Sequence, residues 1–138
     1  MNQYRITVGI RPDMIDHRGE GIRAEMEFMG YPTFGDVRVV RVFHVRGNLD
    51  RAAADRIAGE LLADSVVEIW SVDEPLDPKY GAGLASVEVC LKKGVMDPVQ
   101  ASVRKGVADM GLDATHVWTA KRYLFPGKTG SEILETAA

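Results

Sequence analysis

Two aspartates, Asp16 and Asp97, are the first residues whose type and spacing suggest chemistry, because a positioned carboxylate can act as a general acid or base. Each directly precedes a stretch with helical periodicity, and Asp97 is followed by Pro98, which suits the first position of a helix. An aspartate at this place accepts hydrogen bonds from the free N–H groups of the first turn. We therefore predict that Asp16 and Asp97 cap helices and are not catalytic.

The stretch PGKTGSE has part of the pattern of a phosphate-binding loop, because Gly127, Lys128 and Thr129 follow a predicted strand. The full pattern has another glycine five residues before Gly127, where this sequence has Arg122. Without that glycine the loop lacks the N–H groups that surround a phosphate. The sequence therefore predicts a strand-to-helix turn here and no nucleotide cofactor.

The three histidines, His17, His44 and His116, are far apart and show no ligand spacing with the single cysteine, Cys90. Cys90 lies in the strand-like sequence VEVCL, where we expect it to be buried as a small hydrophobic residue. A buried thiol is a poor nucleophile, because apolar surroundings raise its pKa. We therefore predict no metal site, no cofactor and no catalytic residue.

Tyr123 and Phe125 lie two residues apart on one predicted strand, a spacing typical of aromatic side chains that stack on RNA bases. The first strand of the sequence offers no aromatic partner, the net charge is −3, and no basic run is present. We therefore predict that these aromatics pack in a core or an interface and that the protein binds no nucleic acid.

The sequence also gives no sign of a membrane or secreted protein. No apolar stretch approaches the roughly 18 residues of a membrane-spanning helix, and the start MNQYRITVGI alternates like a strand. A single cysteine cannot form an internal disulfide, which fits a reducing compartment. We therefore predict a cytoplasmic protein with no membrane contact.

The elements that position these residues repeat along the chain. Residues 4–11 alternate as a strand, and a helical stripe runs from Ile22 to Gly30. The same order returns at residues 87–91 and 98–111. Residues at the predicted cap, at the helix end and in the core stripe are identical at a separation of 81 positions: Val8/Val89, Asp16/Asp97, Arg23/Arg104, Met29/Met110 and Gly30/Gly111.

Further strands and a helix complete the first copy. The sequence VRVVRVFHVRG, from residue 37, contains either two short strands or one bent strand. A helix follows at about residues 50–63, and a strand at 66–72. This order predicts an α+β fold made of ferredoxin-like, split βαβ modules in tandem, with antiparallel sheets and helices on one face.

We expect a first module at residues 1–74, a linker rich in Pro and Gly at 75–85, and a second module at 86–138. The second module is incomplete, because the capping box of Thr129 and Glu132 opens a second helix and no closing strand follows. We therefore expect the chain to be part of a longer polypeptide. The alternatives are an empty strand position and a strand supplied by a partner.

Three stretches resemble PurS, the small subunit of phosphoribosylformylglycinamidine synthase: GIRPDMIDHRGEGIRAEMEFMGY, DVRVVRVFHVRG and LLADSVVEIW. That family reads close to KPGVLDPQGxAVxxALxxLGY, VRVGKY and LLANPVIEDY. The resemblance covers residues 4–72 and returns over 86–125. The sequence departs from the pattern at Asp13, His17, Val40 and Gln100.

The resemblance implies a role without catalysis. In that family the small subunit bridges a glutaminase, which releases ammonia, and a synthetase, which consumes it together with ATP in purine biosynthesis. In large single-chain forms, an N-terminal region that resembles two small subunits has this role, which would explain the repeat. We therefore expect glutaminase and synthetase partners, and we also consider a homo-oligomer.

Interface residues are expected because both faces of the predicted sheet are apolar, and an open apolar face packs on another protein. Val40 and Val42 lie on the face opposite Val39, Phe43 and Val45. Cations near strand ends would pair with carboxylates of a partner. The interface candidates are Arg11, Arg38, Arg41, Phe43, Trp70, Lys92, Lys121, Arg122 and Tyr123.

An alternative function is a regulatory module of ACT-like architecture, in which paired ferredoxin-like modules bind a small molecule at their interface. The doubled pattern fits this alternative as well as it fits a scaffold. A thermal shift distinguishes the two, because a ligand well above its dissociation constant stabilises the protein that binds it.

Overall fold

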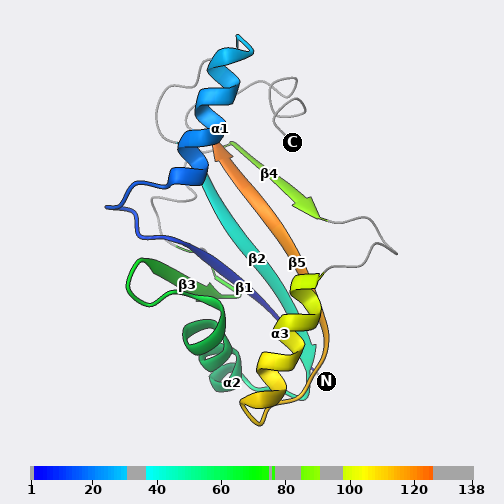
Figure 1. Ribbon diagram of the computed structural model, residues 1–138. Coiled ribbons are helices and arrows are strands. Elements are labelled where there is room, and N and C mark those ends of the chain that lie inside the picture. Colours follow the sequence, from blue (N-terminus) through cyan, green and yellow to red (C-terminus); the bar gives the residue numbers. More distant parts are fainter. Residues whose placement is uncertain (1, 31–36, 75, 77–84, 91–97, 126–138) are drawn as a thin grey trace.

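The computed structural model describes residues 2–30, 37–74, 76, 85–90 and 98–125 (Figure 1). In chain order the elements are β1 (Asn2–Ile10), α1 (His17–Phe28), β2 (Arg38–Gly47), α2 (Arg51–Arg56), the π-helical η1 (Ile57–Leu62), β3 (Glu68–Val72), β4 (Ala85–Cys90), α3 (Pro98–Asp109) and β5 (Ala114–Phe125). Predicted elements that fall on other residues, including the linker apart from 76 and 85 and the turn after β5, lie outside the described residues.

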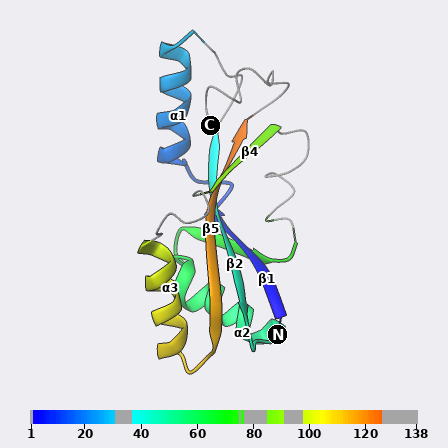
Figure 2. The same ribbon diagram turned by 90° about the vertical axis from the view of Figure 1, so that its right-hand side faces the viewer.

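All described strands belong to one five-stranded antiparallel sheet with the order β3-β1-β2-β5-β4. Strands of both predicted copies therefore share a single sheet, in which β2 and β5 are the central pair. The helices α1 and α3 lie on the same side of this sheet (Figure 2), and α2 buries Ala53 and Ala54 in the core that it shares with α3. The predicted α+β class, with antiparallel strands and helices on one face, is confirmed.

The order of elements recurs along the chain. α3 begins 81 positions after α1 (residue 98 against residue 17), and both helices contain 12 residues. Gly30 and Gly111, just beyond the two helices, both have positive φ, at 86° and 77°. Glycine adopts this left-handed conformation without the steric cost that a Cβ brings, which suits the end of a helix. The division into modules 1–74 and 86–138 stays a prediction.

An approximate two-fold axis relates two β-α-β units, the first formed by β1, α1 and β2 and the second by β4, α3 and β5. Val8 of β1 pairs with Arg41 of β2, and at the equivalent place Val89 of β4 pairs with Lys121 of β5. Arg41 and Lys121 in turn pair with each other. Because equivalent residues face each other only on a two-fold axis, the axis passes between β2 and β5 at this pair.

The main hydrophobic core lies between the helix face of the sheet and the helices α2, η1 and α3. It contains fully buried side chains from both units: Ile6, Val8, Val45, Ile57, Ala58, Val107 and Val117 are each 0% exposed. Burying one branched side chain of this kind contributes about 1.5–3 kcal/mol. One core thus holds together residues that the sequence assigns to two modules.

The helix predicted at residues 50–63 is divided into α2 and η1. Asp50 caps α2 by accepting a hydrogen bond from the Ala53 N–H at 2.7 Å. At the other end, the Ala63 N–H donates to the Ala58 carbonyl at 2.9 Å, five residues back, which is the π-helical spacing. The region 37–47, predicted as two short strands or one bent strand, is the single continuous strand β2.

Candidate functional site

The carboxylate of Asp16 is the N-cap of α1 and also ties this helix to the sheet. One oxygen accepts hydrogen bonds from the backbone N–H groups of Arg18 and Gly19, each at 3.1 Å. The other oxygen accepts a hydrogen bond from the Val39 N–H of β2 at 2.8 Å. Asp16 is 6% exposed, so its charge is held by these three donors. The residue has a structural task, and Asp97 lies outside the described residues.

Two of the predicted interface arginines bond to loops of the chain itself. Arg11 donates from Nε to the Val66 carbonyl and from Nη2 to the Ser65 carbonyl, both at 3.1 Å. Arg38 donates from Nη1 to the Met14 carbonyl at 2.7 Å. These hydrogen bonds hold the turn before β3 and the loop before α1. Both guanidinium groups are therefore engaged within the chain.

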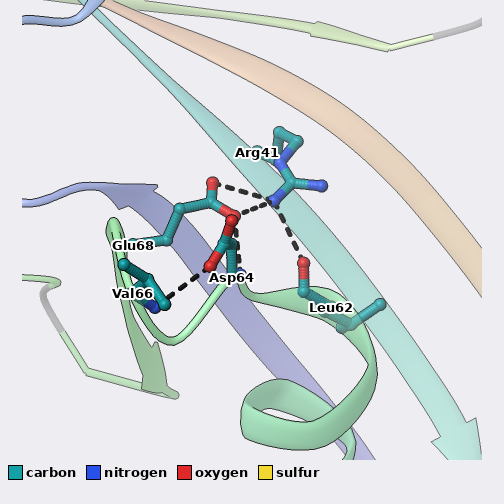
Figure 3. A network of polar contacts seen from close by, with 5 residues as sticks. All are labelled: Arg41, Leu62, Asp64, Val66 and Glu68. Carbon is teal, nitrogen blue, oxygen red and sulfur yellow. Dashed lines mark hydrogen bonds and ion pairs between the residues drawn. The ribbon is translucent and has the colours of Figure 1, made fainter.

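Arg41 forms a third polar network, at the junction of η1 and β3 (Figure 3). Its Nη2 donates to the Leu62 carbonyl at 3.0 Å and to the two carboxylate oxygens of Glu68 at 2.8 and 2.9 Å. Glu68 also accepts a hydrogen bond from the Asp64 N–H at 2.9 Å, and Asp64 accepts one from the Val66 N–H at 3.0 Å. The network fixes the chain between η1 and β3.

Phe43 and Trp70 lie on the helix face of the sheet with different exposure. Phe43 is 3% exposed and belongs to the main core, while the Arg41 guanidinium lies 5.7 Å from its ring centre. Trp70 is 38% exposed and packs on Gly59 of η1, where a Cβ would lie 2.9 Å from the Trp70 ring. Trp70 therefore offers surface to a partner, and Phe43 offers little.

The structure brings four of the predicted interface residues together around one cleft on the helix face. Arg41, Phe43, Lys121 and Tyr123 line this cleft, whose volume is about 560 Å³. Arg122 alternates with Lys121 along β5 and therefore lies on the outer face of the sheet, opposite the helices. Lys92 lies outside the described residues, and Arg11, Arg38 and Trp70 do not line the cleft.

The outer face of the sheet differs from the expectation that Val40 and Val42 would pack on another protein. These side chains are 2% and 0% exposed within the chain itself, so they are not available to a partner. Trp118, which sequence reasoning missed, is 43% exposed on this face. Its ring stacks on His116, with the centroids 5.5 Å apart and an interplanar angle of 11°. The alternation of β5 could have found Trp118, because it points away from the buried Val117.

Helix α1 carries a further exposed apolar side chain and a charged surface pair. Phe28 is 94% exposed, since it lies off the stripe of Met26 that faces the sheet. Arg23 donates to Glu20 at 2.8 Å and to Glu27 at 2.7 Å. The hydrogen bond from Arg23 lowers the pKa of Glu20, and the same bond raises the pKa of Arg23.

The described residues hold no group of three or more His, Cys, Asp or Glu side chains that could bind a metal ion. Cys90 is exposed, so the prediction that it is buried is wrong. The reason is its position as the last residue of β4, which is at the edge of the sheet. No described helix is long and apolar enough to cross a membrane.

Comparison with known proteins gives one family and one solved structure. The family model described as PurS, phosphoribosylformylglycinamidine (FGAM) synthase, matches residues 3–74, just over half of the chain. The solved structure is B. subtilis PurS in a C2 crystal form, with 21% sequence identity and a TM-score of 0.45. The similarity covers 54% of this chain and 100% of the B. subtilis chain. No curated protein matches the sequence.

Proposed function

Because the chain belongs to the PurS family, a component of FGAM synthase in purine biosynthesis, we propose that it is a non-catalytic scaffold of this enzyme. In this role it supports the assembly of a glutaminase part and a synthetase part and the transfer of ammonia between them. The partners are thus glutaminase and synthetase subunits or domains, and the cytoplasm is the place where we expect them to meet.

The pairing of β2 with β5 is the observation that carries this proposal. The ladder runs from Arg38↔Leu124 to Gly47↔Ala114 and joins two β-α-β units into one continuous sheet. Tethering replaces the association of two separate units by an intramolecular contact, with an effective concentration on the order of millimolar for a short flexible linker. The result is a platform that presents two related but different halves to its partners.

Trp118 is our strongest candidate for a partner contact. The residues that dominate the binding energy of an interface are enriched in tryptophan. The surrounding outer face also contains Arg46, so that a carboxylate on a partner would find complementary charge there. Arg5 already pairs with Glu88 at 2.9 Å, which links the first unit to the second across this face.

The test is reconstitution with the cognate glutaminase and synthetase. Glutamine-dependent formation of the amidine should require the chain, while synthesis from free ammonia should proceed without it. If glutamine-dependent activity is the same with and without the chain, the proposal fails. In a synthetase whose own polypeptide carries this unit, the equivalent test is its deletion.

A pair of variants locates the contact. Trp118→Ala should weaken co-purification with the partners by about 30-fold or more, the effect of losing a hot-spot side chain of about 2 kcal/mol. Phe28→Ala removes an equally apolar and more exposed side chain at the far end of α1 and should leave co-purification unchanged. Equal effects of the two substitutions would place the contact elsewhere.

The ACT-like regulatory module is a second candidate, because a cleft at the junction of the two units is where such a module would bind a small molecule, although no described residue of the lining supplies a carboxylate for the ammonium group of an amino acid. A sensor of an amino acid should show a clear thermal shift with glutamine or glycine. A scaffold should show none.

A further inference from the structure

The cleft on the helix face lies on the approximate two-fold axis of the sheet. Its lining contains Arg41 and Lys121, the pair that marks the axis, and the N-terminal turns of α1 and α3 contribute Arg18 and Val99. Arg18 and Val99 are 81 positions apart, the separation of the two helices. The cleft is therefore formed jointly by the two units and is absent from either unit alone.

The charge of this cleft is positive. Neither the Arg18 nor the Lys121 side chain forms an ion pair with any residue that the structure describes. Arg41, in contrast, already shares its Nη2 with Glu68 and Leu62. Among the described residues that line the cleft there is no Asp or Glu. Two cationic side chains from different units thus face one cleft, and none of the described residues that line it supplies a counter-charge.

Apart from Thr119 and Cys90, the other described lining residues are apolar or aromatic. Val89 and Val99 lie near the edge strand and the start of α3, Tyr123 follows Lys121 on the same face of β5, and Phe43 is a buried neighbour on β2. The volume of about 560 Å³ lies within the range of small-molecule pockets, about 300–1,000 Å³. A planar group could stack on the Tyr123 ring while an anionic group reaches the cations.

These features select among small ligands by charge. A phosphate monoester carries about −1.5 to −2 charges at neutral pH, which matches the two unpaired cations. A free amino acid would need a carboxylate to hold its ammonium group, and the described lining supplies none. The N–H groups of Arg18 and Gly19 are already bonded to Asp16, so the side chains have to bind the anion.

We propose that this cleft binds a small phosphate monoester with a planar apolar body, of the size of a nucleoside monophosphate, with Arg18 and Lys121 holding the phosphate. The site lies at the junction of the two units, so a bound ligand contacts both. This binding is separate from the scaffold role, and either can fail without the other.

The first experiment is calorimetric titration of the complete 138-residue chain with AMP, adenosine and inorganic phosphate. AMP should bind more tightly than either fragment, because it alone reaches the cations and the aromatic wall together. Its affinity should fall as salt is added, since salt screens charges on an open site. Absence of AMP binding at millimolar concentration, or equal affinity for AMP and inorganic phosphate, would overturn the proposal.

Variants assign the binding to the cleft. Arg18→Gln and Lys121→Gln should each weaken AMP binding about five- to tenfold, as expected for losing one charge-assisted hydrogen bond at an open site. Arg104→Gln and Lys105→Gln remove the same charges from exposed positions on α3 away from the cleft and are the matched controls. Lys121→Arg should keep the affinity. Equal losses in the cleft variants and their controls would contradict the assignment.

Discussion

The two β-α-β units of this protein contain helices of equal length but hold them against the sheet in different ways. α1 is held at its start, where Gly19 lies directly against the Val37 carbonyl and Asp16 bonds to the Val39 N–H. α3 is held along its length, with Val103 and Val107 buried in the main core. α1 thus combines close backbone contact at its start with the single buried apolar side chain Met26, whereas α3 depends on side-chain packing in the main core.

A neighbouring helix explains this difference. α3 packs against η1, where Gly106 leaves room for the Leu61 side chain; a Cβ there would lie 2.6 Å from Leu61 Cδ1. α1 contacts chiefly β2. The same local pattern of cap, stripe and terminal glycine therefore produces the same helix twice, while the surroundings decide how each helix is anchored.

The largest expected effect tests whether the starts of α1 and α3 are anchored differently. In Gly19→Ala the new Cβ would lie 1.6 Å from the Val37 oxygen, a backbone atom that cannot rotate away. We expect the free energy of unfolding to fall by about 3 kcal/mol or more, as in severe overpacking. Gln100→Ala, at the equivalent position of α3, should change it by less than about 0.5 kcal/mol. Denaturant titration measures both, and equal effects would contradict the difference in anchoring.

The second effect concerns the pair on the axis. Arg41→Met leaves Glu68, whose side chain is 13% exposed, without its cation and should cost about 2 kcal/mol. The cost is below that of a fully buried pair, because the Arg41 side chain is 31% exposed. Lys121 lies opposite Arg41 in the β2–β5 ladder, and Lys121→Met should alter the free energy of unfolding by less than about 0.5 kcal/mol. Thermal unfolding compares the two, and a Lys121 effect as large as that of Arg41 would refute the distinction.

The third effect tests whether the C-terminal ends of α1 and α3 are equivalent. Gly30→Ala and Gly111→Ala each place a Cβ in open space but at positive φ, so that only backbone strain is added. We expect each substitution to reduce the free energy of unfolding by about 1 kcal/mol. Denaturant titration should give the same loss for both. Clearly unequal losses would show that the two helix ends are not equivalent.

The smallest effect is a pH dependence restricted to α1. Arg23 lowers the pKa of Glu20 below its ordinary value of 4.5, so the carboxylate stabilises the folded state above that pH. This contribution is lost as the pH falls through the lowered pKa of the folded protein. The stability difference between the wild type and Glu20→Gln should therefore shrink in acid. Glu25→Gln removes an exposed carboxylate of the same helix that pairs with no described cation and provides the comparison; a wild-type–Glu20→Gln difference independent of pH would contradict the pairing.

The elements of this fold could be predicted where local patterns decide them. The alternation of Ile6 and Val8 predicts β1, and an aspartate before a helical stripe predicts the start of α1 at Asp16. The π-helical turn could not be predicted, because the apolar stripe of residues 50–63 does not distinguish π-helical from α-helical spacing. The pairing of β2 with β5 is likewise a contact between residues far apart in sequence.

The candidate site was less predictable than the fold. A cationic side chain looks the same in the sequence whether it is free or bonded to its own chain. Arg11, Arg38 and Arg41 turned out to bond to loops and to Glu68, whereas Lys121 faces the cleft. Trp118 was overlooked because exposure depends on which face of β5 is covered, and that is set by tertiary packing.

The Arg41–Lys121 pair has a consequence for how this protein can evolve. In a symmetric dimer, a residue on the axis meets its own copy, so every mutation there occurs twice and two arginines would repel each other. Within one chain the two positions can differ. Arg41 bonds to Glu68, while Lys121 lines the cleft. Each flank is thus free to specialise for a different neighbour, which would explain why so few identities survive between the halves.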